Sequence, residues 1–302
     1  MGGSLRERLA AAPITWGVCE VPGWGYQLSP EYVLSDMAAI GFTHTELGPV
    51  GFLPADGEEL ARLLSQHGLS LLGGFVAVVL HDSVRLEAEL TRVASVVDQM
   101  ASAGGTWFIS CPISDHDSWQ RPPLDDAQWD QMFRGFAAID DIAARAGLHH
   151  AFHPHVGALV QDDVETRAVL EHTDTQLVLD TAHLTLGGTD PAALARSHRD
   201  RIGLVHLKDV DAGVARRLRS GQLTLMAAVQ RGLFPPLGHG AVPLAEIIET
   251  LEHDASETWY VLEQDAALSG PDARAVERLR SDVARSLEFV QQCEAALRRP
   301  GG

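Results

Sequence analysis

Three short stretches decide the fold of this chain: LeuValLeuAsp at 177–180, LeuValHis at 204–206 and TyrValLeuGlu at 260–263. Each is an apolar run that ends on an ionisable side chain. Continuous apolar runs of this length are typical of parallel strands that are buried on both faces. The three stretches therefore predict buried parallel strands with polar groups at their carboxyl ends.

Similar runs recur along the chain and alternate with longer segments of helical period, which indicates parallel strands joined by crossover helices. The expected strands are Pro13–Val18, His44–Leu47, Leu69–Val79, Trp107–Cys111, His149–His153, Leu177–Asp180, Ile202–His206 and Trp259–Glu263. Eight such units without a linker predict one α/β domain over residues 1–302, a (β/α)₈ TIM barrel. A doubly wound open sheet is the alternative, but no GxGxxG motif follows the first expected strand.

Helix signals between the strands support this prediction. Apolar residues three and four positions apart at 86–100 and at 276–290 predict amphipathic helices. Ser29 before Pro30 and Asp190 before Pro191 are typical helix starts, and Gly41 suits the residue that ends a helix. We expect a helix after each strand.

The composition excludes several classes of protein. The chain has 302 residues, 45% of them hydrophobic, and 23 Lys and Arg against 41 Asp and Glu, a net charge of −18. Such a charge disfavours binding to nucleic acid and to anionic membranes. The longest apolar run is too short to cross a bilayer and the first residues lack a signal sequence, so we expect a cytoplasmic protein. Three widely spaced cysteines favour neither a disulfide framework nor a thiolate zinc site.

In a TIM barrel the carboxyl ends of all strands meet at the face that carries the active site. Asp180, His206 and Glu263 close three successive strands and are ligand types that divalent metals accept, so we expect them to bind a metal ion. The structural alternative is that they cap helices at the rim. His153 and His155, in a HisProHis motif, are further ligand candidates.

Other polar residues near the strand ends are candidates for the chemistry. His183 lies three positions after Asp180, Glu46 ends the second strand, and Lys208 follows the seventh. Trp16 and Phe52 are candidates for stacking on a substrate, although aromatic residues at such places are equally typical of a core.

Several phrases of the sequence resemble the inosose dehydratase family, within the xylose isomerase-like group of metal-dependent TIM barrels. They are ThrGluLeuGlyPro (45–49), GlyPheLeuPro (51–54), PheHisProHisValGly (152–157), LeuAspThrAlaHisLeu (179–184), ValHisLeuLysAspVal (205–210), GlyLeuPheProProLeuGly (232–238) and LeuGluGlnAsp (262–265). The resemblance covers nearly the whole chain. In one respect the sequence departs from the group: many members carry a metal-binding Glu at the end of the fifth strand, where this chain has His153 or His155.

The resemblance implies a metal-dependent lyase that removes water from 2-keto-myo-inositol through an enolate. It implies Mn²⁺ or Co²⁺, with Mg²⁺ or Zn²⁺ also acceptable, held by Asp180, His206, Glu263 and a histidine, for which we take His153. His155 or His183 would be the base or the acid, with Glu46 as a competing proton-transfer group and Lys208 on a substrate oxygen. Homo-oligomers are common in this group.

Four other functions are alternatives to this dehydratase. A sugar or sugar phosphate isomerase or epimerase uses the same enolate and would exchange solvent deuterium without loss of water. A lyase acting on a 3-keto-glycoside differs only in its leaving group. An abasic-site nuclease needs a basic DNA track, which the net charge disfavours. A non-catalytic polyol-binding protein would need no metal ligands.

Overall fold

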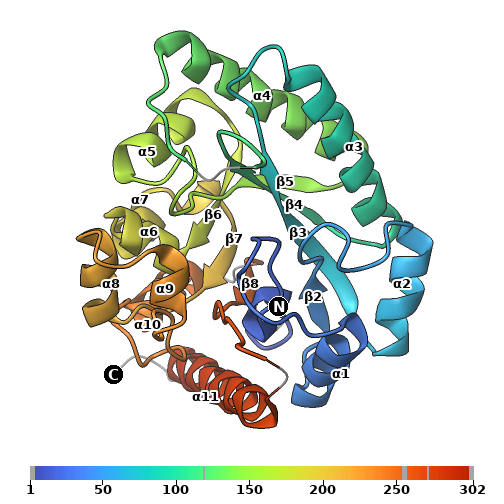
Figure 1. Ribbon diagram of the computed structural model, residues 1–302, viewed down its shortest axis with the longest axis vertical. Helices are drawn as coiled ribbons and strands as arrows, with labels where there is room; N and C mark the ends of the chain where they lie inside the picture. Colours follow the sequence, from blue (N-terminus) through green and yellow to red (C-terminus); the bar gives the residue numbers. More distant parts are fainter. Residues whose placement is uncertain (1–3, 118–119, 254–256, 271, 299–302) are drawn as a thin grey trace.

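Eight parallel strands close into a barrel in which each strand pairs with the next and β8 pairs with β1 (Figure 1). The structure is a computed structural model that describes residues 4–117, 120–253, 257–270 and 272–298. The strands are β1 Leu9–Ala11, β2 His44–Glu46, β3 Ser70–Val78, β4 Trp107–Pro112, β5 His149–Phe152, β6 Gln176–Asp180, β7 Ile202–Leu207 and β8 Trp259–Leu262. The predicted TIM barrel is confirmed.

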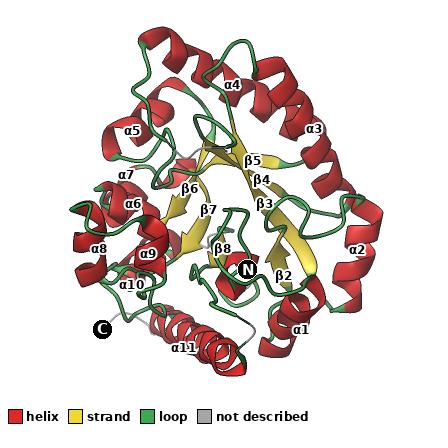
Figure 2. Cartoon of the chain, viewed as in Figure 1, coloured by secondary structure: helices red, strands yellow, loops and turns green. Residues whose placement is uncertain are grey.

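Helices surround this barrel, as the red outer layer around the yellow strands in Figure 2 shows. They are α1 Pro30–Ile40, α2 Gly57–Gln66, α3 Leu86–Ser102, α4 Asp126–Arg145, α5 Asp163–His172, α6 Thr181–Gly187, α7 Pro191–Ser197, α8 Ala212–Arg219, α9 Leu225–Val229, α10 Leu244–Glu252 and α11 Ala273–Leu297. Two short 3-10 helices, η1 Pro13–Trp16 and η2 Arg199–Arg201, precede α1 and β7. Within the described residues, no helix is both long and apolar enough to cross a membrane.

The expected helix ends are confirmed at the positions where capping residues were recognised. Ser29 accepts a hydrogen bond from the Tyr32 N–H and begins α1, and Gly41 ends it with a φ of 95°. Asp190 begins α7 in the same way. The prediction of one helix after each strand is too simple, since β6 is followed by α6 and α7, and β7 by α8, α9 and α10.

The first strand lies earlier in the chain than expected. Strand β1 is Leu9–Ala11, whereas the expected strand at Pro13–Val18 begins with the 3-10 helix η1. Proline has no N–H for a strand ladder and its fixed φ suits the first turn of a helix, so Pro13 ends the strand pairing. The small residues before it have the apolar character that the strand requires.

The barrel is filled from its amino-terminal end by an apolar cluster that includes Trp107, Ile109, Val178, Leu204 and Val261. A larger cluster fills the space between the strands and the helices. Trp107 needs room, and Gly203 provides it, because a Cβ there would lie 2.4 Å from the indole ring. Because this apolar cluster fills the amino-terminal end, the polar groups lie at the carboxyl-terminal end of the barrel.

Candidate active site

Strand register places the predicted ligands beside one another. Asp180, the last residue of β6, pairs with His206 of β7. The Glu263 N–H donates to the Leu207 carbonyl, and the N–H of His153, directly after β5, donates to the Ser110 carbonyl of β4. Because the strands are parallel, the side chains emerge at the same end of the barrel.

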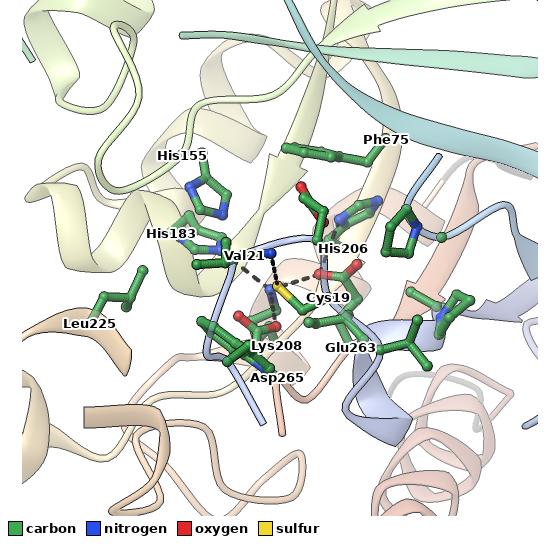
Figure 3. Close-up of a pocket in the computed structure, with 18 of the residues that line it drawn as sticks. Cys19, Val21, Phe75, His155, His183, His206, Lys208, Leu225, Glu263 and Asp265 are labelled. Carbon is green, nitrogen blue, oxygen red and sulfur yellow. Dashed lines mark hydrogen bonds and ion pairs between the residues drawn. The ribbon is translucent and has the colours of Figure 1, made fainter. Parts of the chain in front are cut away.

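The side chains of His153, His206 and Glu263 line a cavity of about 380 Å³, near the lower end of the size range typical of small-molecule sites, whereas Asp180 is fully buried beside them. Glu46, His153, His155, His183, His206, Lys208 and Glu263 all line this cavity. Figure 3 shows the imidazoles of His155 and His183 on one side of Lys208, with His206 and Glu263 on the other. The structure therefore brings together residues that are up to 217 positions apart in the chain.

The four predicted metal ligands form a compact, buried group. His153 Nε2 lies 3.4 Å from Asp180 Oδ2, and His206 Nδ1 lies 3.8 Å from the same oxygen and 3.3 Å from Glu263 Oε2. Glu46 joins them, because its Oε1 atom lies 3.0 Å from His206 Nε2. Ligand atoms of His153, Asp180 and His206 lie within 4.8 Å of one another, as do those of Glu46, His206 and Glu263.

The group has the chemistry of a divalent metal site. Asp180 Oδ2 and His206 Nδ1 are buried and have no hydrogen-bond partner among the described residues, which is costly unless a ligand takes that place. Two imidazoles with two carboxylates are a donor set that first-row transition metals accept. The residues present therefore fit such an ion.

The electrostatics of the cluster also favour a cation. Burial opposes a charge on His206, yet the carboxylates of Glu263 and Glu46 raise its pKa well above the usual value. Burial likewise opposes ionisation of Asp180, but the charge of Lys208 holds the pKa of this carboxyl well below its ordinary range. The carboxylates thus attract positive charge, which a metal ion would supply in place of a proton on His206.

Lys208 lies on the carboxylate side of this cluster and is almost fully buried. Its Nζ atom lies 2.7 Å from Glu263 Oε2, 2.8 Å from Asp265 Oδ1 and 3.6 Å from Asp180 Oδ2. Burial alone would lower the pKa of Lys208, but these three carboxylates raise it well above the ordinary value. The ammonium group therefore stays charged.

His155 and His183 form a pair of neutral imidazoles. Their ring centres are 3.7 Å apart. Burial, with positively charged neighbours, lowers the pKa of His155 to about 3 and places that of His183 well below its usual value. Nδ1 of His155 bonds to the Val156 carbonyl oxygen, which fixes it as the donor nitrogen. Lys208 Nζ lies 3.3 Å from His183 Nε2, so the pair contacts a charged proton donor.

The two aromatic candidates lie outside the cavity lining. Trp16 is completely buried, and its Nε1–H donates to Asp36 Oδ2 at 2.8 Å. Arg280 pairs with the other oxygen of Asp36, so Trp16 links η1 to α1 and α11. Phe52 is half-buried and packs against the core, beside Gly48. The structure thus gives Trp16 a position in the core, the alternative that is equally typical of an aromatic residue at such a place.

Several lining residues were not assigned a role from the sequence. Phe75 of β3 packs edge-on against His153, with ring centres 5.5 Å apart, and Asp265 holds Lys208. Leu225 and Met226 of α9 also face the cavity. The position of Asp265 at the end of an expected strand could have identified it as a site residue. Phe75 follows a pair of glycines within an expected strand. For the α9 pair the sequence offers no signal, because α9 is an extra helix after β7.

Known proteins resemble this chain over most of its length. Residues 34–293 match the family model of the xylose isomerase-like TIM barrel. An inosose dehydratase of Geobacillus kaustophilus is 32% identical over 278 residues, which cover 87% of this chain and 90% of that protein. The rhizopine catabolism protein MocC of Rhizobium meliloti is 32% identical over 267 residues, 85% of this chain and 81% of that one.

Solved structures share the fold at lower identity. The IolI protein with a bound zinc atom has a TM-score of 0.70 and 13% identity, covering 96% of this chain and 99% of that chain. An L-ribulose 3-epimerase has a TM-score of 0.70 and 16% identity, covering 97% of this chain and 96% of that one.

The chain therefore belongs to the xylose isomerase-like TIM barrel family. Within this family it is an enzyme of the inosose dehydratase type, a hydro-lyase.

Proposed function

We propose that the protein is a metal-dependent dehydratase that removes water from a keto-inositol, with 2-keto-myo-inositol as the first substrate to test. The convergence of His153, Asp180, His206 and Glu263 beside Lys208, at the wall of a cavity of small-molecule size, carries this proposal. The inosose dehydratase relatives support the choice of substrate. The zinc atom in the IolI structure supports a divalent ion.

A divalent ion, Mn²⁺ or Co²⁺ by preference and Mg²⁺ or Zn²⁺ as alternatives, would supply a Lewis acid that makes the proton next to the ketone acidic. The protein must then provide a base for that proton and an acid for the departing hydroxide. Both groups have to reach the same small ring, so they should lie on the cavity wall.

His155 is our candidate for the base. Its Nδ1–H donates to Val156, so Nε2 is the nitrogen that accepts the proton when the carbon–hydrogen bond breaks. Glu46 is the alternative base, although its carboxylate already bonds to His206. The acid comes from the pair Lys208 and His183, because Lys208 holds a proton 3.3 Å from His183 Nε2. The departing hydroxyl group takes this proton, and one water leaves for each carbon–oxygen bond that breaks.

The test is to incubate the metal-loaded enzyme with 2-keto-myo-inositol and to follow the conjugated product by ultraviolet absorbance. We expect His155→Gln to keep its metal and to lose turnover by about 10²- to 10⁴-fold, as for loss of a general base. Deuterium uptake from solvent without an absorbance change would instead identify an isomerase. Absence of both reactions, with an active control dehydratase, would refute the proposal.

We also propose that the enzyme acts in the cytoplasm on a small polyol ketone. The net charge of −18 supports this choice over a nucleic-acid or anionic membrane partner.

A further inference from the structure

The two ring nitrogens of His206 contact carboxylates on two different sides of the ring. Nδ1 lies 3.3 Å from Glu263 Oε2 and 3.8 Å from Asp180 Oδ2. Nε2 lies 3.0 Å from Glu46 Oε1, and this contact is a hydrogen bond. His206 and Glu46 are both almost fully buried, so the bond is shielded from solvent.

An imidazole binds one metal ion through a single nitrogen, and the contacts favour Nδ1 of His206. The Nδ1 side of the ring faces two carboxylates, and one of them, that of Asp180, also lies 3.4 Å from His153 Nε2. Nδ1 has no hydrogen-bond partner within the part of the chain that the structure describes, whereas Nε2 is bonded to Glu46. Nδ1 is therefore the nitrogen available to a metal ion.

An irregularity in strand β2 accompanies the position of Glu46. Thr45 pairs with Leu71 of β3, but Glu46 pairs with Gly73, so the register shifts by one residue between them. Such irregularities are common next to active sites, where they change the direction of a side chain. The Glu46 side chain lines the cavity here and reaches the ring of His206.

The bond to Glu46 determines which nitrogen of His206 carries the proton. An ionised carboxylate only accepts hydrogen bonds, so His206 donates its Nε2–H to Glu46. A neutral imidazole has one N–H, so its lone pair is then on Nδ1. A carboxylate in this position orients the ring of a metal-binding histidine and makes its ligand nitrogen more basic.

We propose that Glu46 is a positioning residue, whose carboxylate holds the Nε2–H of His206 and thereby assigns Nδ1 to the metal ion. The inference rests on the metal site of the proposed function. It gives Glu46 a role other than that of the base and leaves His155 as the base.

The first experiment measures Co²⁺ binding to the metal-free enzyme without substrate, by titration followed in visible absorbance. Glu46→Gln keeps the size of the side chain but replaces the carboxylate by a neutral amide, so the dissociation constant for Co²⁺ should rise about 10- to 100-fold. An unchanged dissociation constant with turnover lowered about 10²- to 10⁴-fold would identify Glu46 as a base and overturn the positioning role. If the wild-type enzyme does not bind Co²⁺, the metal site of the proposed function is wrong, and the inference with it.

Glu89→Gln is the matched control. The Glu89 carboxylate also lies 3.0 Å from a histidine Nε2 atom, that of His116, but Glu89 is outside the cavity lining. This variant should bind Co²⁺ with the wild-type dissociation constant. An equal rise in both folded variants would show that the loss at Glu46 does not come from its bond to His206, and would overturn the proposal.

A second experiment needs no variant. In the Co²⁺-loaded wild-type enzyme, the ion shifts the proton signals of bound imidazoles away from the rest of the NMR spectrum. If His206 binds through Nδ1, its N–H is on Nε2 and shows nuclear Overhauser effects to two ring C–H protons. A histidine that binds through Nε2, as expected for His153, shows only one. Absence of any shifted N–H with two such neighbours would overturn the assignment of Nδ1.

Discussion

The two oxygens of the Asp180 carboxylate have separate roles. Oδ1 accepts from the N–H groups of Ala182 and His183, at 2.9 and 2.7 Å, and so begins α6. Oδ2 faces His153 and Lys208. One residue therefore starts the helix that carries His183 and offers an anionic oxygen to His153 and Lys208.

Asp180→Asn separates these two roles, because the amide oxygen of Asn can still cap α6 while its NH₂ group replaces Oδ2. We expect the variant to fold, to lose bound metal and to lose turnover by more than about 100-fold, since even residues that only support metal ligands cost 10- to 100-fold. Metal content by mass spectrometry and the dehydration rate measure the two effects.

Asp190→Asn is the matched control. Asp190 caps α7 with the same pattern, accepting from Ala192 and Ala193, and lies outside the cavity lining. Full activity of Asp180→Asn in metal-free buffer would contradict the assigned role of the metal.

Part of the site was predictable residue by residue. An ionisable group at the end of an otherwise apolar strand, as at His206 and Glu263, costs free energy to bury unless it has a partner. Parallel strands bring such ends together, so the partner is expected at the neighbouring strand ends. Trp16 was not predictable, because an aromatic ring looks the same in a sequence whether its partner is a substrate or, as here, the buried Asp36.

Asp209 organises the loop between α9 and α10. Its carboxylate accepts four backbone N–H groups, from Val210, Gly238, Gly240 and Val242, at 2.8 to 3.0 Å. Phe234, in the segment that leads into this loop, lies over Lys208, with the ammonium 5.2 Å from the ring centre.

Asp209→Ala should lower the free energy of unfolding by about 2 kcal/mol or more, because two buried and two partly buried N–H groups lose their acceptor. Asp211→Ala removes an exposed helix cap of α8 instead and should cost about 1 kcal/mol. Denaturant unfolding of the two variants measures the difference. Equal losses would show that the four hydrogen bonds contribute no more than a single cap.

Elements with a strong internal pattern were predictable, and two short ones, β1 and α9, were not. The apolar spacing at 86–100 and 276–290 corresponds to α3 and α11, because a long amphipathic stripe has one favourable conformation. β1 has three residues and α9 has five. Segments this short are determined by the neighbours they pack against, which a local pattern does not contain.

At the scale of the whole molecule, a metal ion at the strand ends would stabilise the fold as well as the site. Its ligands come from β6, β7 and the residues that follow β5 and β8, so an ion bound only by the folded chain must raise the free energy of unfolding. At 100 times its dissociation constant the gain is about 2.7 kcal/mol.

We therefore expect chelation to lower Tm by several degrees and Mn²⁺ or Co²⁺ to restore it. Differential scanning calorimetry measures the shift, and Asp180→Asn should show almost none. A Tm that does not respond to chelation of enzyme shown to contain metal would argue against a shared ion across these strands.

Hydrogen bonding around the barrel is uneven. A single residue pair, Ala11 and Thr45, sets the register between β1 and β2, whereas six pairs join β3 to β4. On heating, we expect the closed sheet to open first between the two strands that share the fewest residue pairs. These are β1 and β2, and β1 lies directly before η1 and the segment that carries Val18 and Val21. Loosening of the ring would thus begin beside Val18 and Val21, whereas His206 lies on β7, which four residue pairs join to β6 and four to β8.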